Sequence, residues 1–468
     1  MGILCLFSSK AQENYDEDYV PKKYFSELSF NLIRSITIQG GQQILSLDKD
    51  EKHMDQYFAT TTLDLIDLVK REKFIDDDSL KAFLHSIIKK INYNNNIKVP
   101  RRILVLRSDL VNAYSLGEGT LIVSNGLLSQ VDNEEQLAFI IAHEMAHWEL
   151  DHFKDKINQS INAQETYNPE KEMKNISKGN FSVDGIRNIK SWHYDRKRFS
   201  RFVEYQADSL AVILFQNAYG KDQNIVHALH KLDSGTVQNP YKGARIFKDL
   251  SFDKYPFRKE WALMSAEKHI DPSNYSPFDP DSSLTHPEIE RRIGLIEKML
   301  GENGELGESD ISPEYFKIKT DAKFENIESS YANFNFPMTL YYGLRLKSQY
   351  PNNSYLVEVI TKVLVELHNL KKIKELEKHA KDTIGYNTEQ MYVYNFVNNT
   401  EFHELAELSF HFVNKKGNFN SEDEEHYMLL FEICGLTDRY KIQELVRKRY
   451  REKFEKGKYL AQMSDVAN

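Results

Sequence analysis

Apolar residues recur every three to four positions over long stretches of this chain, and that spacing predicts helices. Residues 25–96 carry such patterns, whose apolar positions include Leu63, Leu65, Ile66, Leu68, Val69, Leu80, Phe83, Leu84, Ile87 and Ile88. Two short runs break the helical spacing, Arg-Ile-Leu-Val-Leu at 102–106 and Thr-Leu-Ile-Val at 120–123. Their β-branched residues predict strands. We therefore expect a small sheet within a mostly helical framework.

The second half of the chain divides at its prolines and glycines. Residues 235–284 contain five prolines and few long periodic segments, so they are predicted to be largely irregular. A stretch rich in Gly and Asn predicts a linker over 301–314. Beyond it the helical spacing returns, with a helix pair expected around Tyr350-Pro351-Asn352 that is similar to one tetratricopeptide unit. The sequence thus favours an all-α helical-hairpin region over 315–468 without a clean repeat array.

One predicted helix carries the most informative polar residues of the chain. His143 and His147 stand four residues apart in His-Glu-Met-Ala-His, so both lie on one helix face and can share a zinc ion. Glu144 is one residue off that face, which lets its carboxylate reach a metal-bound water. A helix with ordinary core histidines explains three such groups poorly, because each buried polar group costs free energy unless it has a partner. The spacing therefore predicts a metal site with its own base.

A third metal ligand has to come from elsewhere, because a catalytic zinc usually takes three protein ligands and leaves the fourth position to water. Glu204 is the best candidate, and it lies in a second helical pattern that continues to Phe215. Asp208 is one helical turn further along the same face. A carboxylate there can accept the free N–H of a ligating histidine and fix its tautomer. For Glu204 taken alone, an exposed acidic helix face is the alternative.

Several separated motifs, in this order, carry a resemblance to a known family. They are Asn112-Ala113-Tyr114, Gly119 to Val123, Gly126 to Leu128, Glu134 to Ala138, His143 to His147, Glu204 to Asp208, Thr285-His286-Pro287 and Arg292-Ile293. Over roughly residues 95–300 the chain resembles the HtpX-like and CAAX-prenyl-endopeptidase zinc metallopeptidases, metallopeptidase family 48. The resemblance implies a gluzincin-type α+β domain over 25–300 that binds one Zn²⁺ per chain.

The same resemblance implies roles for five residues. The zinc ligands would be His143, His147 and Glu204. Glu144 would be the catalytic base, and Asp208 would contact a ligating histidine.

Two further assignments also follow from the resemblance. His286 matches a family histidine that can approach the zinc, where it would stabilise the oxyanion or, in a latent form, occupy the open ligand position. An ordinary histidine at a helix start, before Pro287, is the alternative. Asn112, Ala113 and Tyr114 would lie on the edge strand against which an extended substrate pairs through its backbone. The alternative for these three residues is a plain turn.

Composition limits the classes of function. The chain has 468 residues of which 41% are apolar, enough for two domains with sizeable cores. Its net charge of −9 gives no electrostatic case for nucleic-acid binding. No stretch approaches about 18 consecutive apolar residues, so no transmembrane helix is predicted. With only two cysteines, a disulfide framework is excluded.

Residues 1–13 resemble the end of a secretory signal peptide. They hold a short apolar run, then small residues, and a polar start at Glu13. The usual basic segment before the apolar run is missing, and a loosely packed N-terminus is the alternative. The first interpretation predicts a periplasmic or secreted protein, whereas the second leaves a cytoplasmic one open.

These patterns predict a zinc-dependent endopeptidase that hydrolyses extended or unfolded protein substrates, in quality control or processing in the cell envelope. The alternative is a latent or non-catalytic metal-bound chaperone or binding protein that acts through its C-terminal helical region, where it would bind a protein partner. Glu144 favours the enzyme, because a structural zinc site has no use for a base beside its ligand. His286 keeps the latent form open.

Overall fold

A computed structural model describes the chain over ten stretches: residues 19–22, 28–47, 54–155, 157–158, 183–222, 224–233, 246–263, 289–301, 311–379 and 386–463. The chain divides into two compact units. We call residues 22–238 and 275–319 the sheet unit, and residues 1–21, 239–274 and 320–468 the helical unit. Among the helices of the described stretches, none combines the length and the apolar character needed to span a membrane.

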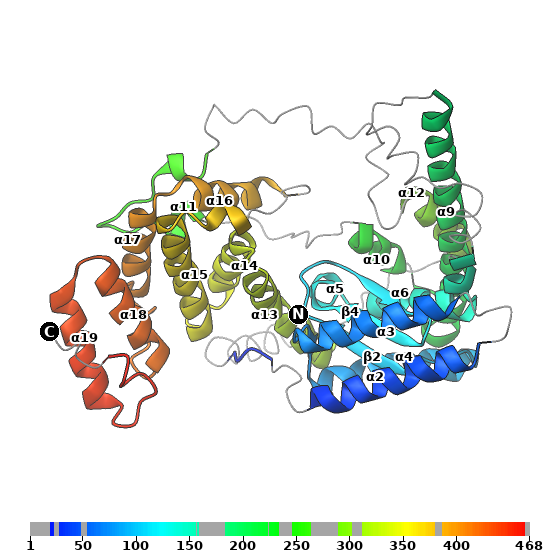
Figure 1. The fold of residues 1–468 in the computed structure, drawn as a ribbon, viewed down its shortest axis with the longest axis horizontal. Helices are drawn as coiled ribbons and strands as arrows, with labels where there is room; N and C mark the ends of the chain where they lie inside the picture. The colour runs from blue at the N-terminus through cyan, green and yellow to red at the C-terminus, as the bar shows by residue number, and fades with distance from the viewer. Residues whose placement is uncertain are drawn as a thin grey trace. The chain divides into compact units, whose positions relative to one another are not determined.

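The sheet unit contains all the described strands and the helices around them (Figure 1). Its elements are α2 (Leu28–Leu45), α3 (Asp55–Lys70), β1 (Phe74–Ile75), α4 (Asp78–Asn95), β2 (Arg102–Leu106), β3 (Ala113–Ser115), β4 (Thr120–Ser124), α5 (Asn125–Gln130), α6 (Glu134–Glu149), α9 (Val183–Tyr219), α10 (Asn224–Asp233) and α12 (Ile289–Leu300). Helix α13 (Pro313–Ala332) begins in this unit and ends in the helical unit.

The four strands form one sheet in the order β1-β2-β4-β3. The central pair is parallel, with Leu104 opposite Ile122, and both outer strands pair antiparallel to it. Helices α2 and α3 pack on each other (Figure 1), and their apolar residues form a core with Leu104 and Ile122. In this order β3 is an edge strand, so one of its sides is not paired within the sheet.

Helix α6 is buried over most of its length. Its N-cap is Asn133, whose side chain accepts a hydrogen bond from the backbone N–H of Gln136 at 2.9 Å. Two glutamates in the first turn complement the positive end of the helix dipole. Helix α9 packs along α6, while α4 contacts both of them and α12 packs on α9. The sequence therefore places the histidine motif between helices in the interior of the unit.

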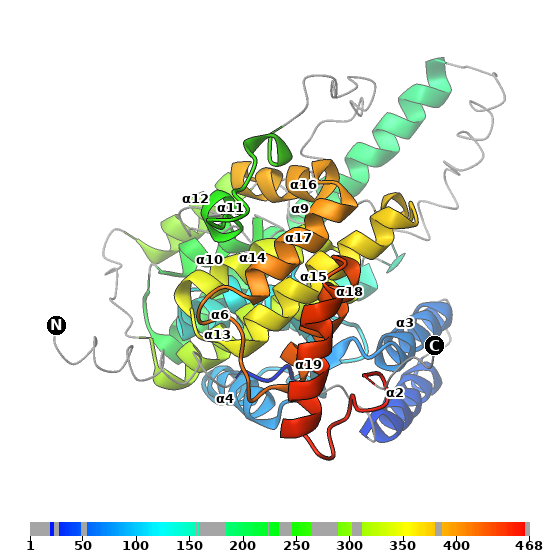
Figure 2. The same ribbon diagram turned by 90° about the vertical axis from the view of Figure 1, so that its left-hand side faces the viewer.

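The helical unit consists of helices alone among its described residues (Figure 2). Its elements after α13 are α14 (Phe336–Gln349), α15 (Ser354–Lys372), η5 (Leu376–His379), α16 (Thr388–Asn399), α17 (Phe402–Val413), α18 (Glu424–Leu436) and α19 (Tyr440–Lys453), and a separate segment contributes α11 (Ile246–Asp249) and η2 (Lys259–Trp261). Consecutive helices pack as antiparallel neighbours would, α14 on α15, α17 on α18 and α18 on α19.

The segment 246–263 belongs to the helical unit, although it lies before α12 in the sequence. Phe257 stacks on Phe396 of α16 with ring centroids 5.7 Å apart, and Trp261 packs edge-on to the same ring at 6.4 Å. Arg258 forms an ion pair with Glu404 of α17 at 2.8 Å. The chain thus enters the helical unit once before α12 and again in α13.

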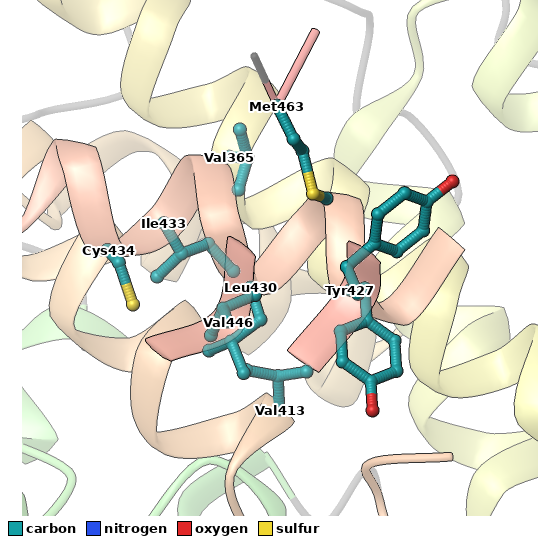
Figure 3. Close-up of a cluster of buried hydrophobic side chains, with 9 residues drawn as sticks. Val365, Val413, Tyr427, Leu430, Ile433, Cys434, Val446 and Met463 are labelled. Atoms are coloured by element: carbon teal, nitrogen blue, oxygen red, sulfur yellow. The ribbon is translucent and has the colours of Figure 1, made fainter. Parts of the chain in front are cut away.

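A second apolar core lies under α18 and α19 (Figure 3). Nine buried residues make it up: Val365, Val413, Tyr427, Leu430, Ile433, Cys434, Val446, Tyr450 and Met463. The thiol of Cys434 is free and buried, and burial raises its pKa to about 11.

The predicted fold class is confirmed, because a mostly helical α+β domain with a small sheet is followed by an all-helical region. The helix pair expected around 350–352 is α14 and α15. The linker over 301–314 stays a prediction, since residues 302–310 lie outside the described residues. The signal segment at 1–13 lies outside them as well.

Candidate metal centre

Helix α6 presents two histidine side chains on one face. The Nε2 atoms of His143 and His147 are 3.1 Å apart, and their rings meet nearly at a right angle, 81°. His143 is buried, and His147 keeps an 11% exposed side chain. Because both Nε2 atoms converge on one point, the pair offers two nitrogen ligands to a single ion.

Helix α9 adds a carboxylate to the same point. The Oε2 atom of Glu204 lies 3.4 Å from Nε2 of His143, and its Oε1 atom lies 3.5 Å from Nε2 of His147. Ligand atoms about 2.0–2.1 Å from a tetrahedral zinc ion are separated by about 3.3 Å. These three residues form the one group of His, Cys, Asp and Glu side chains that could hold a metal among the described residues. The donor set and its spacing fit zinc.

Behind the first histidine, a buried ion pair holds its ring. Nδ1 of His143 lies 3.0 Å from Oδ1 of Asp208. Arg292 of α12 donates two hydrogen bonds to this carboxylate, at 2.7 and 2.8 Å, and its Nη1 lies 3.4 Å from Glu204. The side chains of Asp208 and Arg292 are both 0% exposed. Helices α6, α9 and α12 are therefore joined by one continuous polar network.

The pKa values of the histidines and of Asp208 in this network are set by burial and by neighbouring charged groups. Burial by itself lowers the pKa of His143, but hydrogen bonds to Asp208 and Glu204 outweigh it and raise the pKa to about 9. Burial and the charge of His143 lower the pKa of His147. Burial raises the pKa of Asp208, but Arg292 and His143 bring it below its usual value. Asp208 and Glu204 thus stabilise positive charge at His143, whereas the neutral form of His147 is favoured.

Glu144 is buried beside this centre and has a backbone partner. Its Oε2 accepts a hydrogen bond from the N–H of Ser115 in β3 at 2.9 Å. With Ser115, Gly119 and Trp148 it lines a small cavity of about 10 Å³, which is close to the least space that one water molecule needs. The hydrogen bond fixes the carboxylate between the histidine pair and the edge strand.

The three predicted substrate-binding residues lie at that edge. Ala113 and Tyr114 are in β3 and pair with β4, while Asn112 precedes the strand and its carbonyl accepts a hydrogen bond from the backbone N–H of Ser124 at 3.0 Å. Burial raises the pKa of the half-buried Tyr114. Ala113 and Tyr114 thus lie on the edge strand and Asn112 just before it, and their role in substrate binding stays a prediction. His286 lies outside the described residues.

The sequence analysis missed His152, which is buried behind the second histidine. Its Nδ1 lies 2.9 Å from Nδ1 of His147, and its Nε2 lies 3.3 Å from Oε1 of Gln206 in α9. Gln206 can accept the Nε2–H of His152, which leaves the Nδ1 of His152 to accept from His147. His147 then carries its proton on Nδ1 and keeps Nε2 free for a metal.

A local turn brings His152 into place. Asp151 has the left-handed φ of 54° just after α6, which reverses the chain and returns His152 to the helix. His152 lies five residues beyond the His143–His147 motif and shares no helix face with it. The spacing of residues in the sequence therefore did not indicate its contact with His147. The role of Arg292 was missed as well, although a charged residue on the apolar face of α12, beside Ile289, Ile293 and Ile296, is an unusual feature.

Comparison with known proteins identifies the family to which this part of the chain is similar. Residues 76–300 match the model of peptidase family M48. A 74-residue stretch, 16% of the chain, is 30% identical to the β-barrel assembly-enhancing protease of Escherichia coli (strain K12), of which it covers 15%. Over 186 residues, 39% of the chain, it is 23% identical to the mitochondrial metalloendopeptidase OMA1 of Arabidopsis thaliana, of which it covers 36%.

These matches span far less than two thirds of either relative. The family model covers the part of the chain that holds the histidine pair, Glu204 and Arg292. Residues 76–300 are thus a domain of peptidase family M48, a family of metallopeptidases.

Proposed function

We propose that this chain is a zinc endopeptidase that cleaves extended or unfolded polypeptides. The observation that carries the proposal is the tetrahedral spacing of His143, His147 and Glu204 with the carboxylate of Glu144 beside them. A structural site would use a fourth protein ligand and no neighbouring base. The similarity to the β-barrel assembly-enhancing protease of Escherichia coli also supports peptide-bond hydrolysis.

His143, His147 and Glu204 would hold a zinc ion, and its charge would supply polarisation of the scissile carbonyl and a lowered pKa for the attacking water. Glu144 would then take the proton of that water and later deliver a proton to the leaving amine. The hydrogen bond from the Ser115 N–H holds its carboxylate in one orientation. Asp208 and His152 keep the two imidazole rings in the tautomer that leaves each Nε2 free.

The substrate class follows from the edge strand. An extended segment can add to β3 through its backbone donors and acceptors, and Ser115, at the end of this strand, contacts the proposed base. A compact domain cannot offer its backbone in this way. Unfolded chains and loops are therefore the proposed substrates, and the likeness to a β-barrel assembly-enhancing protease supports a quality-control or processing role in the cell envelope.

Zinc content and cleavage of casein, compared between the wild type and Glu144→Gln, test this proposal. We expect about one zinc per chain in both proteins and cleavage by the wild type alone. Glu149→Gln, the same change later in the same helix, is the matched control and should retain activity. Cleavage by Glu144→Gln would contradict the role of the base. Metal in both with cleavage in neither would favour the latent or binding alternative, with its partner on the C-terminal helices.

A further inference from the structure

Helix α9 runs for about six turns before it reaches the proposed zinc ligand Glu204. No proline interrupts it over Val183–Tyr219. At its far end, Tyr219 donates a hydrogen bond to Glu134 at the start of α6, at 3.2 Å. Glu204 lies instead against His147, near the end of α6. The two helices are therefore antiparallel, and the turns of α9 before Glu204 lie beyond the end of α6 (Figure 1, Figure 2).

These turns of α9 are strongly basic. Residues 186–201 contain six Lys and Arg residues against a single Asp, in a chain whose net charge is −9. Helical geometry also sorts these charges, since each residue turns the helix by about 100°. Lys190, Lys197 and Arg201 lie within about 60° of Glu204 around the helix axis. We call these three residues the basic face.

Acidic residues lie away from the basic face. Asp184 and Asp195 are the acidic residues of positions 183–203, and both lie about 160–180° from Glu204, on the opposite side of the helix. The face of α9 that carries Glu204 is therefore positively charged over its first turns. A helix face that is merely solvated commonly alternates charges of the two signs instead.

The basic face lies in line with the metal centre. Arg201 is one helical turn before Glu204, and its side chain is partly exposed. Lys197 and Lys190 are seven and fourteen residues before Glu204, which is about 10 Å and about 21 Å along the helix axis. An extended polypeptide covers these distances in about three and about six residues. A chain that reaches the metal centre along α9 would therefore pass the basic face within a few residues of its scissile bond.

We propose that the basic face is an exosite, a binding site outside the catalytic centre, for polypeptides with acidic residues about three to six positions from the scissile bond. Charges of one sign along the approach to a site raise the association rate of partners of the opposite sign. The occupant is a polypeptide because the basic face leads to Glu204, a ligand in a peptidase-family domain. The inference rests on the proposed function and adds to it a substrate class, extended chains of negative charge.

Two matched fluorogenic peptides test this exosite. Both are unstructured and share a neutral centre, but one carries three Glu on each side of the centre and the other carries Gln at those positions. We expect the full-length, zinc-loaded wild type to cleave the Glu peptide with a kcat/KM about tenfold higher. The difference should shrink between about 0.1 M and about 1 M salt, because the screening length falls from about 10 Å to about 3 Å. Cleavage of both peptides with equal kcat/KM at low salt would overturn the proposal.

Charge reversals at matched positions separate the basic face from the total charge of α9. Lys190→Glu combined with Lys197→Glu should remove the preference for the Glu peptide, so that the ratio of the two kcat/KM values falls from about ten to about one. Arg196→Glu combined with Arg198→Glu is the matched control. It changes the net charge by the same amount, but Arg196 and Arg198 lie at least about 80° from Glu204 around the axis, so the preference should remain. An equal loss of preference in both double variants would reject the basic face as the site.

Binding measured without cleavage distinguishes this proposal from the proposed peptidase function. Fluorescence anisotropy with the full-length Glu144→Gln protein and the same two peptides should show about tenfold tighter binding of the Glu peptide. If this preference is found but the wild type cleaves neither peptide nor casein, the peptidase function fails and the basic face stands. If casein is cleaved but the Glu144→Gln protein binds both peptides equally, the basic face fails and the peptidase function stands.

Discussion

Two interiors of this protein are equally buried and chemically opposite. Between α6, α9 and α12 the interior includes a network of charged side chains, of which Asp208 and Arg292 are 0% exposed. Under α18 and α19 the buried side chains are almost all apolar, and Val413, Ile433 and Cys434 are also 0% exposed (Figure 3). Burial alone therefore does not distinguish a site from a core.

The two interiors should differ in how much stability is lost when a buried side chain is truncated. Buried charges persist only when each has a partner, so removing one leaves another without compensation. An apolar core loses only the contacts and volume of the atoms removed. The same number of deleted atoms should thus cost far more in the ionic interior, and variants of each can measure this.

The largest effect is expected for Arg292→Met. The change leaves the Asp208 and Glu204 carboxylates without their buried cation, which should lower the free energy of unfolding by about 3–5 kcal/mol. Urea denaturation monitored by circular dichroism measures it. Arg291→Met, on the exposed side of the same helix, should stay within about 0.5 kcal/mol. Equal effects of the two variants would contradict the ionic network.

His152→Leu should come next, with a loss in metal affinity. Without the contact between its Nδ1 and that of His147, the ligand ring is no longer held, and such losses reach about 10–100-fold in affinity. Competition with a zinc-binding dye measures it. His152→Asn places an acceptor oxygen near the lost Nδ1 and should recover most of the affinity. If Leu and Asn variants bind zinc as the wild type does, His152 has no positioning role.

His426 is a buried histidine of the helical unit, and it predicts a pH dependence of stability. Burial lowers its pKa below the ordinary 6.5, and its Nδ1 accepts the backbone N–H of Asn420 at 2.9 Å. Below about pH 6.5 the unfolded chain binds a proton that the folded histidine does not, so stability falls as the pH drops through that value, by at most about 1.4 kcal/mol per unit. His426→Asn should show a flatter profile in denaturation from pH 7 to 5. An identical slope would exclude His426 as the source.

The smallest effect belongs to the apolar interior. Ile433→Val removes one methylene group from the core under α18 and should cost about 1 kcal/mol. The same urea experiment measures it. A loss as large as that of Arg292→Met would show that the two interiors do not differ as proposed.

Much of the fold and the central site could be predicted from local patterns. The spacing of His143 and His147, the N-cap region before α6 and the helical pattern around Glu204 all lie within single elements. Arg292 and His152 were missed because their roles depend on contacts between elements, to Asp208 at 84 positions' separation and to Gln206 at 54. The hydrophobic periodicity of a single helix carries no information about contacts between distant elements.

The segment 246–263 sets a limit on how this protein could be divided. It precedes α12, yet its aromatic rings pack against α16 and its Arg258 pairs with α17. A chain cut after residue 301 would keep Phe257 and Trp261 but lose the surface that covers them. Such a fragment would expose adjacent aromatic rings and be prone to aggregation. The peptidase domain therefore cannot be separated from the helical unit by a single cut in the chain. A recombinant version of the domain has to omit or redesign the segment 246–263.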